Sequence, residues 1–229
     1  MRYDFILFDA DDTLFDFQTT AKKCFLEASK FFGLPSNEEN YYLYRDINQN
    51  LWDEYALGKI EKKVIIKLRF TIYGEKIGKT IDPDAFAKIY EEKLSKTSIL
   101  FPETVITLES LKSLGVNLYL ITNGTKHVQR GRLTLSGIEG FFDGIFISDE
   151  MGCSKPSSKY LEIVENSIKG FDRKRALICG DSLVSDIPLG TDNGIDTCFF
   201  NPNGILPTKK VNYTYEIKSL REIIEIIKN

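Results

Sequence analysis

Three carboxylates crowd the end of an apolar segment near the start of the chain. The run YDFILFDADDT, residues 3–13, places Asp9, Asp11 and Asp12 directly after a stretch typical of a buried strand. Like charges this close repel one another unless a cation, a proton or a hydrogen-bond network compensates them. The segment therefore indicates that a cation or a shared proton lies at the end of this strand.

Taken alone, this acidic cluster is also compatible with a simpler role. Aspartates at a strand–helix turn commonly cap the following helix. A calcium-binding loop is excluded, because such a loop needs glycine at its sixth position and glutamate at its twelfth. Counted from Asp9, those positions hold Leu14 and Thr20.

Polar residues follow three further apolar segments in the same way. They are Thr122, Asn123 and Gly124 at the end of residues 116–122, Lys155 before Pro156 after residues 144–148, and Asp181 and Asp186 after residues 175–180. By itself each motif is a common turn or a solvated charge. Together they offer carboxylate oxygens, which suit Mg²⁺, and a hydroxyl, backbone N–H groups and an ammonium, which suit phosphoryl oxygens.

A parallel sheet is the scaffold that would bring these motifs together. Continuous rather than alternating hydrophobicity predicts strands buried on both faces. Amphipathic helical patterns separate them, so the order of elements predicts a doubly wound, mostly parallel, Rossmann-like α/β sheet. Ligands in such sheets bind beyond the carboxyl ends of the strands. The expected strands are 3–9, 116–122, 144–148, 175–180 and 195–200, and the clearest helical patterns are 102–115, 157–170 and 219–229.

About eighty residues interrupt this alternation after the first strand. The region 17–96 carries helical spacing throughout and no segment typical of a buried strand. We therefore expect an inserted all-α cap at 17–96 and a catalytic core formed by 1–16 and 97–229. Cap opening and closure would use hinges near Phe17 and Thr97.

Bulk composition indicates an ordinary globular protein. The 229 residues carry a net charge of −3 without a basic stripe, which argues against a nucleic-acid partner. No apolar run reaches the ~18–20 residues of a membrane span, and no signal segment begins the chain. We expect a cytoplasmic protein, a monomer or weak dimer, with reduced thiols and no zinc site, given its scattered cysteines and single histidine: Cys24, Cys153, Cys179, Cys198 and His127.

In order and spacing, the four motifs resemble those of the haloacid dehalogenase superfamily: Asp9-x-Asp11-x-Thr13, Thr122-Asn123-Gly124, Lys155-Pro156 and Gly180-Asp181-x₄-Asp186. The resemblance covers the whole core, and the helical insert is similar to that superfamily's α-helical cap. Dehalogenases lack the second acid, which phosphate-transferring members carry. The resemblance therefore implies a phosphatase or phosphotransferase that depends on Mg²⁺ or Mn²⁺.

The same resemblance assigns roles to individual residues. Asp9 would attack phosphorus as the nucleophile, and Asp11 would protonate the leaving group and later activate water. Thr122, the N–H of Asn123 and Lys155 would hold the non-transferring phosphoryl oxygens. Asp12 and Thr13 would brace the loop. The implied metal ligands are Asp9, the backbone carbonyl of Asp11, and Asp181, with Asp186 as a further ligand or close neighbour.

A second, weaker resemblance concerns the substrate, a small phosphorylated metabolite. Segments such as FDADDTLFDF, LWDEYALGKI and GIDTCFFNPNG resemble bacterial house-cleaning 5′-nucleotidases that prefer pyrimidine monophosphates. A base needs a flat apolar surface to stack on, and the candidates are Phe15, Phe17, Trp52 and Tyr55. Trp52 and Tyr55 could instead pack between cap helices, because Leu51, Tyr55 and Ile60 share one apolar stripe.

The segment after the second motif has other polar residues. His127 and Gln129 could approach a substrate, although a lone histidine on a solvated helix favours surface exposure. Arg130 and Arg132 are expected to be surface charges or ion-pair partners.

Other functions remain open. Within enzymes these are another capped phosphatase, acting on phosphoglycolate or a sugar phosphate, and a phosphomutase. A receiver-type signalling domain also presents acids, a threonine and a lysine, but its phosphorylated aspartate lies on a middle strand without a helical insert. A catalytically inactive binding module would bind its ligand without Mg²⁺.

Overall fold

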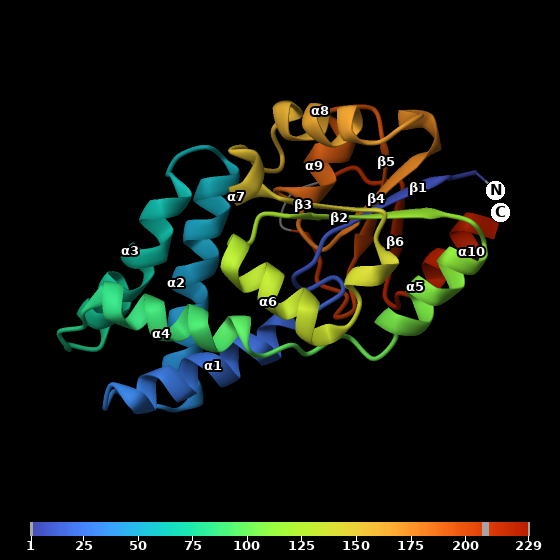
Figure 1. Cartoon of the computed structure of the whole chain (residues 1–229). Helices are drawn as coiled ribbons and strands as arrows, with labels where there is room; N and C mark the ends of the chain where they lie inside the picture. Colours follow the sequence, from blue (N-terminus) through green and yellow to red (C-terminus); the bar gives the residue numbers. More distant parts are fainter. Residues whose placement is uncertain (1, 208–210, 229) are drawn as a thin grey trace.

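The computed structural model describes residues 2–207 and 211–228 and contains a six-stranded parallel sheet (Figure 1). The strand order is β3-β2-β1-β4-β5-β6, and every neighbouring pair is parallel. The five predicted strands are confirmed, whereas β6 was not predicted. The strands are β1 (Phe5–Phe8), β2 (Asn117–Thr122), β3 (Gly144–Ile147), β4 (Ala176–Gly180), β5 (Asp196–Phe200) and β6 (Tyr215–Ile217).

Helices cover both faces of this sheet, which explains the continuous hydrophobicity of its strands. Along β1, Ile6 and Phe8 face one hydrophobic core, and Phe5 and Leu7 face another. The first core is closed by α5 (Thr104–Ser113), α6 (Lys126–Ser136) and α10 (Glu222–Lys228), and the second by α8 (Ser158–Ser167) and α9 (Asp186–Thr191). The predicted doubly wound α/β fold is confirmed. The remaining core elements are α7 (Ser148–Met151), η1 (Glu139–Phe141) and η2 (Arg173–Arg175).

Four helices between β1 and α5 form a second body, the cap, beside the sheet (Figure 1). They are α1 (Phe17–Phe31), α2 (Glu38–Ala56), α3 (Lys62–Lys76) and α4 (Pro83–Ser95). Side-chain caps fix three of their starts: Asp16 accepts from the Thr19 N–H, Asn37 from the Asn40 N–H, and Asp82 from the Asp84 and Ala85 N–H groups.

An aromatic cluster holds the cap helices together. The rings of Phe25 on α1 and Tyr44 on α2 stack with centroids 4.4 Å apart. Tyr44 also stacks on Phe70 of α3, and Phe70 packs on Phe86 of α4 at 4.6 Å. All four rings are fully buried or nearly so. The cap therefore has its own hydrophobic core, to which Val128 of α6 contributes from the sheet side.

The two chain segments that join cap and core run side by side. The Asp16 N–H donates to the Ile99 carbonyl, and the Phe101 N–H donates to the Leu14 carbonyl, both at 3.0 Å. Thr104 Oγ1 adds a buried bond to the same Leu14 carbonyl at 2.8 Å. The expected hinge positions, 17 and 97, lie just on the cap side of this paired segment.

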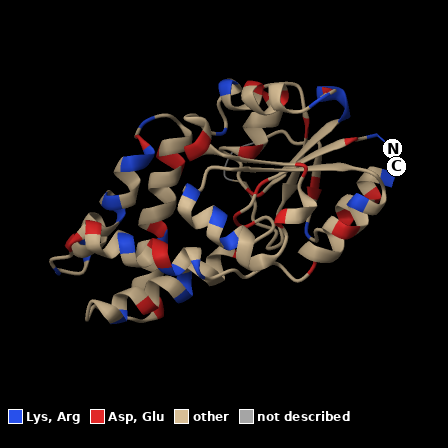
Figure 2. Ribbon diagram, in the orientation of Figure 1, with Lys and Arg blue, Asp and Glu red and all other residues tan. Residues whose placement is uncertain are grey.

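Charged residues of both signs are spread over the helices of core and cap (Figure 2). Among the described residues, no helix is long and apolar enough to cross a membrane.

Candidate active site

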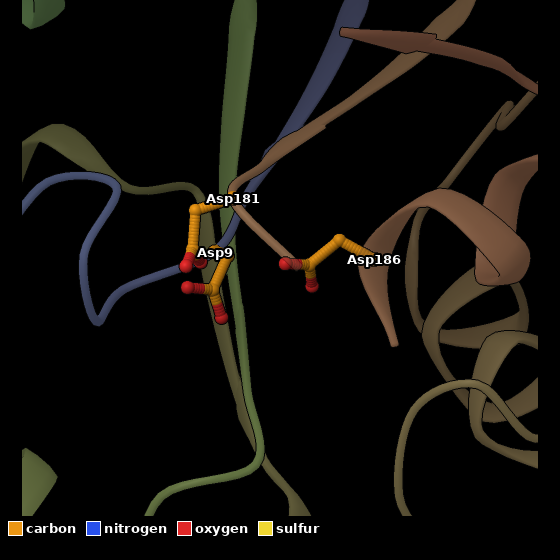
Figure 3. Close-up of side chains that lie close together, drawn as sticks. All are labelled: Asp9, Asp181 and Asp186. Atoms are coloured by element: carbon orange, nitrogen blue, oxygen red, sulfur yellow. The ribbon is translucent and has the colours of Figure 1, made fainter. Parts of the chain in front are cut away.

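Three aspartates from different elements meet at the carboxyl edge of the sheet. Asp9 follows β1, Asp181 follows β4, and Asp186 is the first residue of α9. Because β1 and β4 are hydrogen-bonded neighbours, their carboxyl ends are adjacent. One carboxylate oxygen of each aspartate lies within 4.8 Å of the others. Figure 3 shows the three carboxyl groups turned toward a common space.

Lys155 is the cation of this cluster. Its side chain is 1 % exposed, and Nζ pairs with Asp9, with Asp186 Oδ1 at 2.7 Å, and with the Ile121 carbonyl at 3.0 Å. The backbone of Lys155 is held by Asn123, whose Oδ1 accepts from the Lys155 N–H and whose Nδ2 donates to the Lys155 carbonyl, both at 2.9 Å. The second motif thus fixes the third through a side chain, a contact that the sequence did not suggest.

The charge balance of the cluster favours a bound cation. Burial, together with the nearby charges of Asp186 and Asp11, raises the pKa of Asp9 to about 8 even though Lys155 opposes the shift. Burial also raises the pKa of Asp181, with added contributions from Asp12 and Asp9. One ammonium, that of Lys155, faces three carboxylates, and all of the atoms that the three aspartates offer to a metal ion are oxygens. Such a donor set fits Mg²⁺, with room for Mn²⁺.

Close packing explains the glycine in the second motif. Thr122 is buried, and its Oγ1 accepts from the Gly124 N–H at 3.0 Å. A Cβ at Gly124 would lie 2.1 Å from Gln129 Nε2, so any side chain here would displace Gln129. The loop therefore keeps its backbone next to α6, within the wall of the cavity described below.

Two residues of the first motif brace the loop after β1. Thr13 Oγ1 lies 3.4 Å from Asp9 Oδ2. Asp12 adopts a left-handed backbone conformation, with φ of 58°, and its carboxylate accepts from the Gln18 N–H and from Gln18 Nε2 at 3.1 and 2.6 Å. These contacts are those expected of bracing residues.

Two side chains of α6 hold the Asp11 carboxylate, one at each of its oxygens. Gln129 Nε2 donates to Asp11 Oδ2 at 2.6 Å, and Arg132 pairs with Asp11 Oδ1. Of the two roles expected for Arg132, surface charge is wrong, because the side chain is completely buried; it is an ion-pair partner. The signal in the sequence was the i,i+3 spacing, which places residues 129 and 132 on one helix face.

The buried guanidinium of Arg132 also packs against two of the aromatic rings that were expected to contact a base. It lies 4.3 Å from the ring centre of Phe15 and 5.3 Å from that of Phe17. Phe15 is fully buried beneath it and lies outside the cavity wall, whereas Phe17 contributes to that wall.

One cavity joins the aspartate cluster to the cap. Its core side includes Asp9, Asp181 and Lys155, and its cap side includes Trp52 together with Tyr44, Asn48, Arg69, Tyr90 and Glu91. Tyr55 lies outside this wall and packs edge-on against Trp52, with ring centres 5.7 Å apart. The polar cap residues were missed from the sequence, because nothing local distinguishes them from surface charges.

Lys62 of the cap is a second residue that sequence reasoning missed. Its Nζ donates to the Gly124 carbonyl at 2.7 Å, to Ser148 Oγ at 3.0 Å and to Asp149 Oδ1 at 2.6 Å. All three acceptors belong to the core, so this lysine ties α3 to the loop after β2 and to α7. The remaining candidates on α6 lie away from the cavity: His127 is exposed, and Arg130 pairs with Glu150 and Glu139.

Comparisons with known proteins point to one family. Residues 6–200 match the profile of the family described as haloacid dehalogenase-like hydrolase. The chain is 31 % identical to pyrimidine 5′-nucleotidase PynA of Streptococcus pneumoniae over 227 residues, covering 99 % of this chain and 96 % of that protein. It is also 31 % identical to pyrimidine 5′-nucleotidase YjjG of Escherichia coli, covering 96 % and 98 %.

A solved structure resembles the whole chain. The HAD-hydrolase YfnB of Bacillus subtilis, determined bound to magnesium, superposes with a TM-score of 0.93 at 33 % identity and covers 100 % of both chains.

Proposed function

Because the chain belongs to the haloacid dehalogenase-like hydrolase family, we propose that it is a Mg²⁺-dependent phosphatase of pyrimidine nucleoside 5′-monophosphates. The observation that carries the proposal is the single cavity whose core side holds Asp9, Asp181 and Lys155 and whose cap side is aromatic. An enzyme of this type is a phosphoric monoester hydrolase, and the names of its relatives support that class.

The first half of the reaction transfers the phosphoryl group to the protein. A carboxylate oxygen of Asp9 forms a bond to phosphorus while the ester P–O bond breaks. Asp11 enters this step protonated and gives its proton to the leaving 5′-oxygen, so the nucleoside departs as a neutral alcohol. Lys155 stabilises the growing charge on the phosphoryl oxygens, and Thr122 and the Asn123 N–H orient them.

The second half releases inorganic phosphate. A water attacks phosphorus and passes a proton to the Asp11 carboxylate, while the bond from phosphorus to Asp9 breaks. Asp9 and the protonated Asp11 are thereby restored. Gln129 and Arg132 hold Asp11 beside the cavity in the structure, where it can exchange this proton with the water.

Asp9, Asp181, Asp186 and the backbone carbonyl of Asp11 would hold the metal, which supplies positive charge between an anionic nucleophile and an anionic ester. The oxygen-only donor set and the excess of carboxylates over ammonium groups support this assignment. Mn²⁺ offers the same chemistry to the same ligands.

The cap side of the cavity favours a flat substrate over a small acid. The partly exposed ring of Trp52 presents apolar surface on which a base can stack. Tyr44 and Tyr90 also line this wall, but their rings are packed in the cap core. The only guanidinium buried in this wall, among the described residues, is Arg69, and Glu91 already balances its charge. Arg45, a half-buried arginine of the same wall, pairs with Asp46, so both arginines there already have an acidic partner.

A phosphate-release assay with Mg²⁺ tests this proposal. The panel contains UMP, dUMP and dTMP, with ribose 5-phosphate and glycolate phosphate as competitors. We expect the nucleotides to have the highest kcat/KM. A tenfold advantage of glycolate phosphate would assign the enzyme to another branch of the family.

A further inference from the structure

We propose that Arg69, Asn48 and Glu91 form a polar site on the cap that reads the hydrogen-bonding edge of a uracil or thymine ring. The inference rests on the proposed function, because it takes the phosphate to lie at the aspartate cluster and the base to lie against the cap. It assigns a specificity role to three residues that take no part in the chemistry.

Arg69 combines burial with incomplete pairing. It is 4 % exposed, yet it belongs to the wall of the cavity that also holds Asp9. Its Nε donates to the Ile66 carbonyl at 3.3 Å, one terminal nitrogen to Asn48 Oδ1 at 3.2 Å, and the other to Glu91 Oε1 at 3.3 Å. All three bonds are longer than the usual ~2.9–3.0 Å.

A guanidinium has five N–H groups, and these bonds use three of them. Within the described part of the chain, the hydroxyl of Tyr44 lies near the guanidinium but makes no hydrogen bond of good geometry with it, so these bonds leave at least one terminal N–H without a protein acceptor. Buried donors seek an acceptor, and leaving one unmet costs about 1–3 kcal/mol. A carbonyl oxygen of a ligand in the cavity can supply what the protein does not.

The position of the guanidinium is fixed before any ligand arrives. Its central carbon lies 4.8 Å from the ring centre of Phe70 and 5.3 Å from that of Tyr90, and both rings are buried in the cap core. The donors of Arg69 are therefore held in a defined plane. A preorganised donor discriminates between ligands better than a flexible one, because less freedom is lost on binding.

Glu91 decides what kind of acceptor fits. It pairs with Arg69, so the two side chains together carry no net charge, and a second anionic group would meet the carboxylate. A neutral ring with carbonyl oxygens on either side of an N–H is complementary. Arg69 would donate to one carbonyl of uracil or thymine, and Glu91 would accept from the ring N3–H. Asn48, while its Oδ1 accepts from Arg69, would donate through Nδ2 to the other carbonyl.

The test compares a nucleotide with the same substrate lacking its base. We expect Arg69→Met to lower kcat/KM for UMP by about 10- to 100-fold, the range for lost hydrogen bonds to a charged group. The loss should appear mainly in KM, because the interaction is present in ground and transition states alike. The kcat/KM of Arg69→Met for ribose 5-phosphate should stay within about twofold of wild type. The control variant Lys67→Met, at an exposed neighbouring position, should also stay within about twofold on this substrate.

The possible outcomes distinguish a failure of this inference from a failure of the proposed nucleotidase function. A wild-type enzyme that hydrolyses UMP and ribose 5-phosphate equally well would refute the nucleotide function itself. If Arg69→Met keeps the wild-type preference for UMP, only the proposed polar site on the cap would be refuted. Equal losses on both substrates would mean that Arg69 merely supports the cap, and would also overturn the inference.

Two further measurements cover the case in which Arg69→Met fails to fold. Glu91→Gln removes the charge that excludes acids, so the activity ratio of glycolate phosphate to UMP should rise about tenfold. With the wild-type enzyme, 3-methyluridine 5′-monophosphate should react at least tenfold more slowly than UMP, because its N3–H is replaced. An unchanged ratio in the first, or equal rates in the second, would contradict the proposal.

Discussion

The sheet edge and the cap line the same cavity, but they do so with different kinds of structure. At the sheet edge, charged groups lie at the ends of β1, β4 and the loop before Pro156, and each is tied to backbone that the sheet holds in place. In the cap, the wall consists of aromatic rings packed between helices, with Arg69 and Glu91 as a neutral pair among them. If the proposed function is right, the difference teaches that the chemistry is anchored by strand register, whereas selectivity depends on how four helices pack.

The two regions also differ in how their charges are balanced. Lys155 faces three carboxyl groups, and burial raises the pKa of Asp9 and Asp181, so the sheet edge holds acidic groups whose protons a cation can displace. The cap wall is balanced without a ligand. Changes at the sheet edge should therefore affect every substrate, and changes in the cap should distinguish one substrate from another.

The strongest test of this contrast is Asp9→Asn. We expect kcat to fall by at least about 10³-fold on UMP and ribose 5-phosphate alike, because the amide is no longer a nucleophile. Phosphate release measures the effect, with Asp192→Asn, an exposed aspartate of the core, as the matched control. Turnover above a tenth of wild type would remove Asp9 from the role of nucleophile.

Metal addition should change stability in a pH-dependent way. The pKa of Asp9 is raised to about 8 in the metal-free fold, so its contribution to stability is present below the unfolded pKa near 4 and is lost as pH rises through about 8. Mg²⁺ requires the deprotonated carboxylates. At 100-fold excess over its Kd, we expect it to raise Tm by about 5–10 °C, and more at pH 8 than at pH 6.

Thermal unfolding with and without Mg²⁺ measures this shift. Asp181→Asn should abolish it, whereas Asp192→Asn should leave it intact. A Mg²⁺ effect that is larger at pH 6 would contradict the assignment of these carboxylates as ligands.

Lys62 sharpens the comparison, because it is a cap residue bonded to the core. Lys62→Met removes three hydrogen bonds between α3 and the core, and we expect KM to rise about tenfold for UMP and ribose 5-phosphate equally. Lys63, its exposed neighbour, pairs only with Glu61 among the described residues and offers the control Lys63→Met. A loss confined to UMP would show instead that Lys62 contacts the base.

The smallest effect is expected at Trp52. Trp52→Ala should lower kcat/KM for UMP by about fivefold, the lower end of base stacking, because the ring also packs on Tyr55 and lies beneath Lys62. Trp52→Phe should recover most of the loss. If ribose 5-phosphate suffers as much as UMP, the ring acts in packing alone.

Much of the geometry of the candidate site was predictable from the chain. Asp9 and Asp181 directly follow β1 and β4, Thr122 ends β2, and Lys155 follows β3 after α7. Because parallel strands place their carboxyl ends at one edge, order along the chain implied proximity in space. The helical cap was predictable for a similar reason, because its apolar spacing is local. The short strand β6 was not, since three residues carry too little pattern.

The sequence by itself determined which residues end the strands and which segments form helices, because period and spacing act over a few residues. Only the tertiary structure decided that Arg132 is buried against Asp11, that Phe15 faces this guanidinium, and that Arg69 meets Glu91 from another helix. Those contacts join residues 22 to 121 positions apart. They depend on the packing of helices and on the way the cap rests over the sheet, which no local pattern records.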